Sequence, residues 1–172
     1  RSFAIERIRA RRRQPGIRPQ HLAAVRAMAE ICQAETEGVA LESRSLCFAP
    51  TVMPQAGDYC WDVGTAGAVS LIFQCVLWPL AVAEGDSQVK LIGGTHVEWS
   101  PPMDYVQKVY LPVLSTLSNA KLADLRVERW GWYPRGGGVI QAHIRGSIQL
   151  GPLTMLERGA LRHVSVVSAA SN

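Results

Sequence analysis

At 172 residues, with 48% hydrophobic and 19% charged side chains, the chain has the composition of a globular protein and the length of one domain or a large part of one. Its formal net charge of +4 and isoelectric point near 9.1 permit a nucleic acid or another anionic partner without requiring one. The longest apolar run, residues 66–83, contains Gln74 and Pro79, so it indicates a core helix and not a membrane span. We therefore expect a cytoplasmic protein without membrane contact.

The first third of the chain predicts one strand, one helix and two further strands. Phe3 and Ile5 alternate with Ala4 and Glu6 as in a short strand. After Pro19, apolar side chains recur at spacings of three and four residues, which predicts a helix over residues 19–34. Two short strands are expected at residues 39–42 and 45–48, joined by a polar turn.

The middle of the chain predicts two helices that alternate with strands. A strand at residues 59–63 leads to a helix that Thr65 would cap and that ends near residue 83. A strand at residues 89–92 precedes a second helix over residues 103–117. We expect Pro112 to kink this helix. Its apolar face is expected to carry Tyr105, Val109, Val113 and Leu117.

The last third predicts three more strands. Leu125 and Val127 alternate with charged residues in the first, and residues 139–144 form its return strand. A final strand is expected at residues 161–168.

The order of these elements repeats. Residues 58–145 give strand, helix, strand, helix, strand, strand, and residues 3–48 give the same order without its first strand and helix. We therefore predict an α/β (α+β) fold of repeated βαβαββ units, with helices packed on one face of mixed four-stranded sheets. The predicted units are residues 1–57 (incomplete at its start), residues 58–145, and residues 146–172 as the truncated start of a third.

The positive charge is concentrated at the beginning of the chain. Residues 1–18 contain seven arginines and a single acidic residue, Glu6, whereas the remainder has more acidic than basic side chains. A guanidinium group binds phosphate oxygens through two parallel hydrogen bonds and stays charged at any working pH. The segment thus predicts a phosphate-bearing ligand. A solvated basic face or an interaction arm is the alternative that charge alone leaves open.

The cysteines do not indicate a metal site. Cys32, Cys47, Cys60 and Cys75 include no CxxC pair and have no paired histidines. Their apolar surroundings predict reduced, buried thiols of a cytosolic protein.

Six segments resemble, in order and with near-matching intervals, the motifs of the RNA 3′-terminal phosphate cyclase family. They are IRARRRQPGIRPQHLAAV at 8–25, GTAG at 64–67, SLIFQ at 70–74, GGT at 93–95, SPPMDY at 100–105 and YPRGGG at 133–138. Each motif alone is weakly specific, but the six together extend the resemblance over essentially the whole chain.

The resemblance implies an EPSP-synthase-like fold of three βαβαββ units with a small inserted domain. It also implies a reaction that uses ATP and Mg²⁺ (or Mn²⁺) to convert an RNA 3′-phosphate end into a 2′,3′-cyclic phosphate. In this family a histidine attacks the α-phosphorus of ATP, AMP passes to the RNA 3′-phosphate, and the 2′-hydroxyl then displaces AMP. ATP and RNA 3′-phosphate ends are therefore the expected partners, and a homo-oligomer is left open.

The chain departs from the family pattern at both ends. Of the family's segment before the arginine-rich motif, this chain matches only Arg1 and Ser2. Residues that the family pattern has between these two and Phe3 are absent. The family's adenylated histidine lies beyond Asn172. We therefore expect no catalytic residue and no metal ligand in this chain, which would supply the N-terminal half of the site.

The resemblance assigns phosphate or RNA contacts to Arg1, Arg9, Arg12 and Gln20. Converging guanidinium groups stabilise the charge of a phosphoryl-transfer transition state. Gln20 would lie at a helix N-terminus, which attracts anions. Solvent exposure of the arginines and an ordinary first-turn position of Gln20 are the alternatives.

Other candidates near these residues receive no such role. Arg11 and Arg13 have no family counterpart, and surface solvation is expected for both. His21 is not matched to the family's nucleophile, so a structural or surface role is expected.

Two residues are assigned to ATP by the resemblance. Gln74 is the only polar side chain between Ser70 and Pro79, and a buried amide without partners costs about 1–3 kcal/mol. The family uses a glutamine here to contact ATP, and a hydrogen bond to backbone within the core is the alternative. Pro101 matches a proline against which adenine packs, which is compatible with a helix-start proline. We expect the arginine-rich loop, Gln74 and Pro101 to form one concave floor for a nucleotide.

Three functions fit these observations. The first is the N-terminal half of a cyclase, the second a cyclase-like RNA-binding or ribosome-assembly protein without catalysis, and the third an inactive fragment. The first is favoured by Gln20, the GTAG segment and the intact GGT, because the cyclase-like relatives tend to vary there.

Overall fold

In the computed structural model, which describes residues 1–118 and 120–170, strands and helices alternate largely as the sequence predicts. The strands are β1 (Phe3–Ile5), β2 (Glu35–Glu37), β3 (Leu46–Ala49), β4 (Asp58–Asp62), β5 (Ser87–Gly93), β6 (Ala123–Arg129) and β7 (Gly138–Ile144). The helices are α1 (Pro19–Ile31), α2 (Val69–Val82), α3 (Met103–Tyr105), the π-helical segment η1 (Val106–Tyr110) and α4 (Leu111–Ser118). The α/β class is confirmed.

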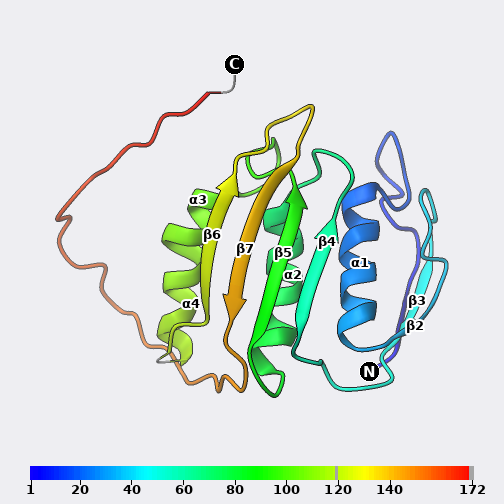
Figure 1. Cartoon of the computed structure of the whole chain (residues 1–172), viewed down its shortest axis with the longest axis horizontal. Coiled ribbons are helices and arrows are strands. Elements are labelled where there is room, and N and C mark those ends of the chain that lie inside the picture. The colour runs from blue at the N-terminus through cyan, green and yellow to red at the C-terminus, as the bar shows by residue number, and fades with distance from the viewer. Residues whose placement is uncertain (119, 171–172) are drawn as a thin grey trace.

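The larger sheet has the strand order β4-β5-β7-β6. Strands β4 and β5 are parallel, and the other neighbours are antiparallel, so the sheet is mixed. Helix α2 makes the crossover that a parallel pair requires. Figure 1 shows α2 and the continuous helix from α3 to α4 on the same face of this sheet, as the βαβαββ pattern predicts.

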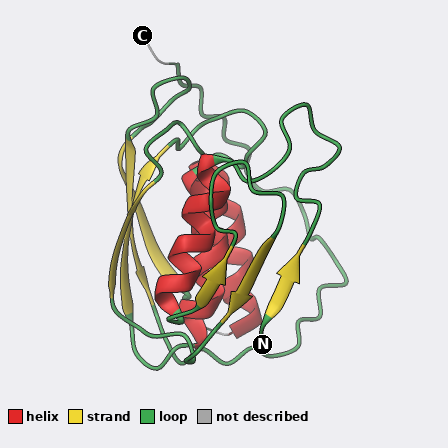
Figure 2. Cartoon of the chain, turned by 90° about the vertical axis from the view of Figure 1, so that its right-hand side faces the viewer, coloured by secondary structure: helices red, strands yellow, loops and turns green. Residues whose placement is uncertain are grey.

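The smaller sheet is antiparallel, with the order β1-β3-β2. Helix α1 separates it from the rest of the molecule, and Figure 2 shows the helices between the two sets of strands. One side of α1 contributes Ala27 and Ile31 to the main core with α2. Its other side packs against Leu46 and Phe48 of β3. Because α1 belongs to both cores, it joins the two sheets.

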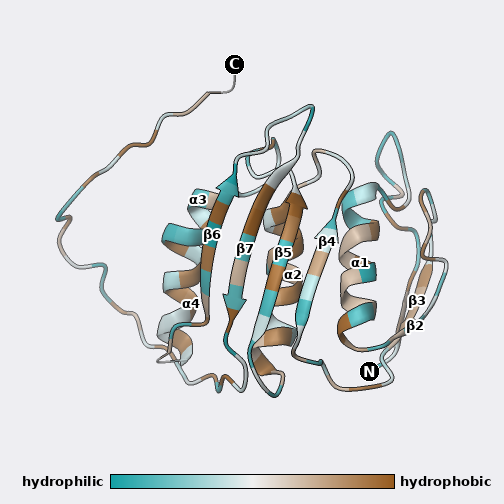
Figure 3. Cartoon of the chain, in the orientation of Figure 1, coloured by the Kyte–Doolittle hydropathy of each residue, from teal (hydrophilic) through white to brown (hydrophobic). Residues whose placement is uncertain are grey.

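Helix α2 lies at the centre of the main core. Phe73, Leu77 and Leu80 on this helix are completely buried, and they pack against Leu91 of β5 and Ile140 of β7. In β5 buried residues alternate with more exposed ones, as expected for a strand covered on one face. Figure 3 shows α2 largely in the colour of apolar residues behind the sheet.

Two predicted boundaries are wrong because the backbone has other partners. Residues 39–42 form turns and not a strand, since Glu42 donates a hydrogen bond to the carbonyl of Ile17 at 2.8 Å. Thr65 does not cap α2, which begins at Val69. The backbone before it is extended because Val69 donates to the carbonyl of Gly94 at 2.9 Å, and Gly94 donates to that of Gly67 at 2.8 Å.

The predicted strand at residues 161–168 is also wrong. Residues 151–170 have no helix or strand and are exposed. A strand requires a hydrogen-bonded neighbour, and within the part of the chain that the structure describes none pairs with this segment.

The helix over residues 103–118 differs from its prediction in shape and orientation. A π-helical segment, η1, precedes Pro112, which lacks an N–H and would clash with the carbonyl four residues earlier in a regular helix. Tyr105, Val109 and Val113 are 44–45% exposed. The core is instead contacted by Met103, Val106 and Leu111, so three of the four residues assigned to the apolar face lie on the outside, and the fourth, Leu117, is half-buried.

The cysteines are free, but only one is buried as predicted. Cys32 belongs to the core around β3, whereas Cys47, Cys60 and Cys75 are exposed. Cys47 and Cys60 lie on strand positions that point away from their cores, Cys47 between two buried residues and Cys60 between the half-buried Tyr59 and the buried Trp61. In the described residues, no helix has the length and apolar character needed to cross a bilayer.

Candidate functional site

Four loops that carry the sequence motifs meet, with other loops, at the end of the molecule that is uppermost in Figure 1, which we call the loop end. They are residues 6–18, 63–68, 94–102 and 130–137. The parallel strands β4 and β5 end here, and α1, α2 and α3 begin here. Helix N-termini offer free N–H groups and the positive end of the helix dipole. The topology therefore gathers groups that favour anions at the loop end.

Arg9 is fixed within the first of these loops. Its Nη1 donates to the carbonyl oxygens of Gln14 at 2.6 Å and Gly16 at 3.1 Å. Its backbone φ of 53° is in the left-handed region, which a non-glycine residue adopts at an energetic cost. Arg12 lies in the same loop and is exposed. Both arginines are thus at the loop end, one anchored and one on the surface.

Arg1 is not at the loop end. It precedes β1, and Figure 1 shows the N-terminus at the opposite end of the molecule. With Ser2 alone between Arg1 and β1, the chain has no length in which to return. The structure therefore does not bring Arg1 to the other predicted phosphate ligands.

The first turn of α1 is closed by the imidazole of His21. The backbone N–H of Arg18 donates to Nδ1 of His21 at 3.1 Å. Burial foremost, and then the positive charges of Arg9 and Arg18, lower the pKa of His21 below its ordinary 6.5. Arg18 is the N-cap residue of α1 and Arg9 bonds to the carbonyl of Gly16 just before it, so both arginines lie near the start of α1. His21 has the structural role expected of it.

Gln20 joins the start of α1 to the start of α2. Its Oε1 accepts a hydrogen bond from the backbone N–H of Ala68 at 3.3 Å. One turn into α2, Nε2 of Gln74 donates to the carbonyl of Ser70 at 3.1 Å, which is the backbone bond considered as the alternative to a ligand. The hydroxyl of Ser70 is buried and has no hydrogen-bond partner among the described residues. Because Ser70 is completely buried in the first turn of α2, its hydroxyl belongs to the core and not to a surface that a ligand can reach.

Pro101 lies in the loop before α3 and is half-buried. Its neighbour Pro102 is the N-cap of α3, and Met103 donates to the carbonyl of Thr95 at 3.2 Å. Pro101 is thus held at the loop end. The single concave floor that would include Arg9, Gln74 and Pro101 stays a prediction.

The glycine motifs of the loop end pack against each other. A Cβ at Gly136 would lie 2.7 Å from the Cα of Ala66, and a Cβ at Gly94 would lie 2.4 Å from the carbonyl oxygen of Ala66. No neighbour lies within 4 Å of the Cβ position of Gly64 or Gly137 among the described residues. Two of these glycines therefore permit close packing, and two leave the backbone uncovered.

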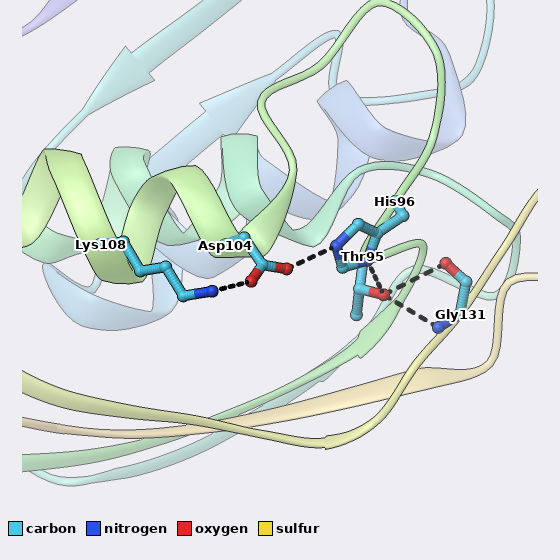
Figure 4. A network of polar contacts seen from close by, with 5 residues as sticks. All are labelled: Thr95, His96, Asp104, Lys108 and Gly131. Atoms are coloured by element: carbon cyan, nitrogen blue, oxygen red, sulfur yellow. Dashed lines mark hydrogen bonds and ion pairs between the residues drawn. The ribbon is translucent and has the colours of Figure 1, made fainter. Parts of the chain in front are cut away.

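A polar network holds two of the loops together, as Figure 4 shows. The hydroxyl of Thr95 accepts a hydrogen bond from the N–H of Gly131 at 2.9 Å and lies 2.9 Å from Nδ1 of His96. Nε2 of His96 is 3.1 Å from Oδ2 of Asp104, whose Oδ1 accepts from Lys108 at 2.7 Å. The hydrogen bond from Lys108 foremost, and also that from His96, lowers the pKa of Asp104, while burial opposes them.

This network is structural. Threonine, histidine and aspartate in series are also the parts of a nucleophilic triad. The side chain of Thr95, however, is buried and its hydroxyl is bonded to Gly131. Its reactive atom is therefore unavailable to a substrate, and the network fixes the ring of His96.

Two indole rings contact the imidazole of His96, that of Trp130 stacked on it and that of Trp132 tilted against it. The centroid of His96 lies 4.2 Å from that of Trp130 and 5.1 Å from that of Trp132, with interplanar angles of 15° and 30°. These rings, Pro102 and Asp104 line a hollow of about 200 Å³ that Val167 and Ala169 also border. The sequence reasoning missed this cluster. The available signal was the interleaving of arginine and aromatic residues over residues 126–135.

The described residues contain no group of three or more His, Cys, Asp or Glu side chains that could hold a metal ion. Mg²⁺ usually keeps several waters and is bound through one or two carboxylates together with substrate phosphates, so a metal that arrives with ATP would need no such group. No step is therefore assigned to a metal held by this chain.

Comparison with known proteins places the chain in a family. Residues 1–169 match the family model described as RNA 3′-terminal phosphate cyclase. A protein of that name from Gloeothece citriformis is 52% identical over 163 residues, which cover 91% of this chain and 46% of that protein. Another from Trichormus variabilis is 46% identical over 170 residues, covering 95% and 48%. A third, from Desulfurococcus amylolyticus, is 44% identical over 156 residues, covering 90% and 43%.

The chain belongs to the RNA 3′-terminal phosphate cyclase family. It spans about half the length of the curated relatives that it matches.

The hydrogen bond to His21 predicts a pH dependence of stability. Nδ1 must be unprotonated to accept from Arg18, and the pKa of His21 is lower in the folded state than its ordinary 6.5. The unfolded state therefore binds the proton first, and the free energy of unfolding should fall as the pH decreases from 6.5 through the folded pKa. His21→Gln keeps an acceptor at this helix position without a titrating ring and should flatten that part of the profile. Chemical denaturation between pH 7.5 and pH 5 measures both curves, and a His21 that titrates at or above 6.5 by NMR would contradict this account.

Proposed function

We propose that this chain forms the N-terminal part of an enzyme that uses ATP to convert the 3′-terminal phosphate of RNA into a 2′,3′-cyclic phosphate. The match of residues 1–169 to the cyclase family carries the proposal. The convergence of Arg9, Gln20 and the start of α2 at the loop end supports it, because phosphate groups need positive charge and hydrogen-bond donors. The nucleophilic histidine of the proposed reaction is outside this chain.

The proposed reaction has three displacements at phosphorus. A histidine nitrogen bonds to the α-phosphorus of ATP, and pyrophosphate leaves. An oxygen of the RNA 3′-phosphate then bonds to this phosphorus, and the histidine is released. Finally the 2′-hydroxyl oxygen bonds to the 3′-phosphorus, loses its proton, and AMP leaves. The covalent intermediate divides one difficult step into easier ones, because each step has a good leaving group.

The residues of this chain would bind and orient the two substrates. Arg9 and Arg12 would neutralise phosphate charge in the transition states. Gln20 would orient the same groups from the start of α1. Gln74 and Pro101 would bind the adenosine.

The histidines of this chain do not suit the role of nucleophile. His21 accepts a backbone hydrogen bond, and His96 lies between Thr95 and Asp104. His143 forms an ion pair with Asp86 at 2.9 Å. His163 lies in the exposed segment that has no secondary structure. This agrees with the proposal that the adenylated histidine belongs to another part of the protein.

The direct test is incubation of the full-length protein with ATP labelled at the α-phosphorus, together with Mg²⁺. We expect an acid-labile nucleotidyl adduct and, after addition of RNA with a 3′-phosphate, a cyclic end. His21→Gln should still form the adduct. No adduct with retained RNA binding would favour a cyclase-like binding protein, and a label on His21 would overturn the assignment of the histidines. The 172-residue chain alone should form no adduct.

A second measurement reports phosphate binding by this chain itself. The positive charges of Arg9 and Arg18 contribute to the lowered pKa of His21. Pyrophosphate bound beside them would offset these charges and raise the pKa of His21. NMR titration with and without pyrophosphate should show this increase, and an unchanged titration would argue against a phosphate site at the start of α1.

A further inference from the structure

We propose that His96, Trp130 and Trp132 form a stacking platform for a nucleobase of single-stranded RNA, upstream of the phosphorylated 3′ end. This inference rests on the proposed function, since it names how the body of the same RNA substrate is held. We call the three residues the ring platform.

The geometry of the ring platform suits a flat aromatic ligand. The three rings lie within 30° of parallel, and Trp130 and Trp132 have centroids 5.8 Å apart at 16°. Trp130 is 41% exposed although it is large and apolar. Bases of single-stranded nucleic acid stack on such exposed rings, and RNA recognition uses this mode widely because unpaired bases present their faces.

Hydrogen bonds orient the histidine of the ring platform and hold its loop to the backbone that carries the two tryptophans. His96 is held by hydrogen bonds at both ring nitrogens, to Thr95 and Asp104. The backbone N–H groups of Thr95 and His96 both donate to the carbonyl of Gly131, which lies between the two tryptophans. A preorganised surface loses little conformational freedom on binding, so the stacking energy is retained as affinity.

The surroundings of the ring platform favour RNA over an apolar partner. The exposed Arg129 and Arg135 flank the tryptophans in the sequence, and the acidic groups on the facing side are Glu98 and Asp104, of which Asp104 is paired with Lys108. Arg129 is oriented by a hydrogen bond from its Nε to the carbonyl of Gly137 at 2.7 Å. The ring platform also shares the loop end with the arginine-rich loop. An RNA strand with its 3′-phosphate at the arginines would thus meet aromatic rings and further positive charge on the same end of the molecule.

Trp99 strengthens this interpretation. It is 97% exposed at the tip of the loop that carries His96, and its backbone φ is 63°. An exposed indole on a strained backbone is unfavourable for stability and is typical of a binding loop.

The test uses the full-length protein and a 5′-fluorescein-labelled RNA with a 3′-phosphate, with binding followed by fluorescence anisotropy. Trp130→Ala should weaken binding about five- to a hundredfold, and Trp130→Phe should recover part of the loss. In turnover, Trp130→Ala should raise KM for RNA and leave kcat largely unchanged, because the platform binds the strand away from the reacting phosphate. Phe3→Ala is the matched control, since Phe3 is also an exposed, stacked aromatic residue but lies on the smaller sheet. It should leave RNA affinity unchanged.

RNAs with one abasic nucleotide, moved stepwise along the strand, identify the stacked base. The wild-type protein should lose affinity at one upstream position, and Trp130→Ala should lose nothing further there. Two results would overturn the platform. One is an equal loss of RNA affinity in Trp130→Ala and Phe3→Ala. The other is a Trp130→Ala variant that binds every abasic RNA more weakly than the wild type does. A Trp130→Ala variant that is less stable but binds RNA with unchanged affinity would also overturn the platform. The rings would then serve only to pack Val167 and Ala169. The nucleotidyl adduct is measured in parallel, so a failed platform with an intact adduct leaves the proposed function standing.

Discussion

Gly136→Ala is expected to lower the free energy of unfolding by about 2–5 kcal/mol, because it combines backbone strain with a backbone collision. Gly136 has a φ of 68°, where an L-residue is strained. Its Cβ would also lie 2.7 Å from the Cα of Ala66 and 2.8 Å from the carbonyl oxygen of Thr65. Neither atom belongs to a flexible side chain, so one of the two loops must move. Urea denaturation of the wild type and the variant measures the change.

Gly137→Ala separates the two causes. Gly137 has the same φ of 68°, but its Cβ position has no neighbour within 4 Å among the described residues. The substitution therefore keeps the strain without the collision, and we expect a loss of about 1–2 kcal/mol. Equal losses at the two positions would mean that the loops at residues 64–67 and 133–138 are not packed together as described.

The order of the elements from β3 to β7 could be predicted from the sequence, because it depends on local periodicity. The alternation in β5 and the apolar run of α2 each identify their element without knowledge of its neighbours. Thr65 shows where such reasoning fails. The residue is a good helix cap, yet the start of α2 is decided by Gly94, some thirty residues away in the sequence, which bonds to Gly67 and Val69.

The orientation of the helix over residues 103–118 could not be predicted for a different reason. Its apolar residues occur on more than one side, so the stripe of Tyr105, Val109 and Val113 is as regular as the buried one. Periodicity then cannot decide which side faces the sheet. The π-helical segment before Pro112 changes the register once more.

The candidate site was partly accessible from the sequence. The concentration of arginines is visible in the sequence, and it lies at the loop end except for Arg1. The hydrogen bond from Ala68 to Gln20 depends on how α1 meets α2, and no local pattern shows it. The stacking of His96 with Trp130 was equally hidden, because the two residues are on different loops that the hydrogen bonds of Thr95 and His96 to Gly131 bring together.

Arg9→Ala is expected to lower kcat/KM of the full-length protein for RNA 3′-phosphate ends by about 10²–10³-fold, the usual effect of removing one preorganised group that stabilises transition-state charge. The side chain is already oriented by the carbonyls of Gln14 and Gly16, so its charge needs no rearrangement during the reaction. Arg9→Lys keeps the charge without the planar fork, and its activity should lie between those of the wild type and Arg9→Ala.

Arg13→Ala is the matched control for charge. Arg13 is an exposed arginine of the same loop, so its loss changes the net charge equally, and kcat/KM should remain within about twofold of the wild type. Equal losses for Arg9 and Arg13 would indicate a diffuse basic surface in place of an anchored phosphate ligand. The pKa of His21 tests whether Arg9→Ala acts locally, because removal of the nearby positive charge should raise it. A large loss of kcat/KM together with a raised pKa of His21 would show that the effect is local. Adduct formation, measured separately from RNA turnover, would then show at which displacement the Arg9 guanidinium acts.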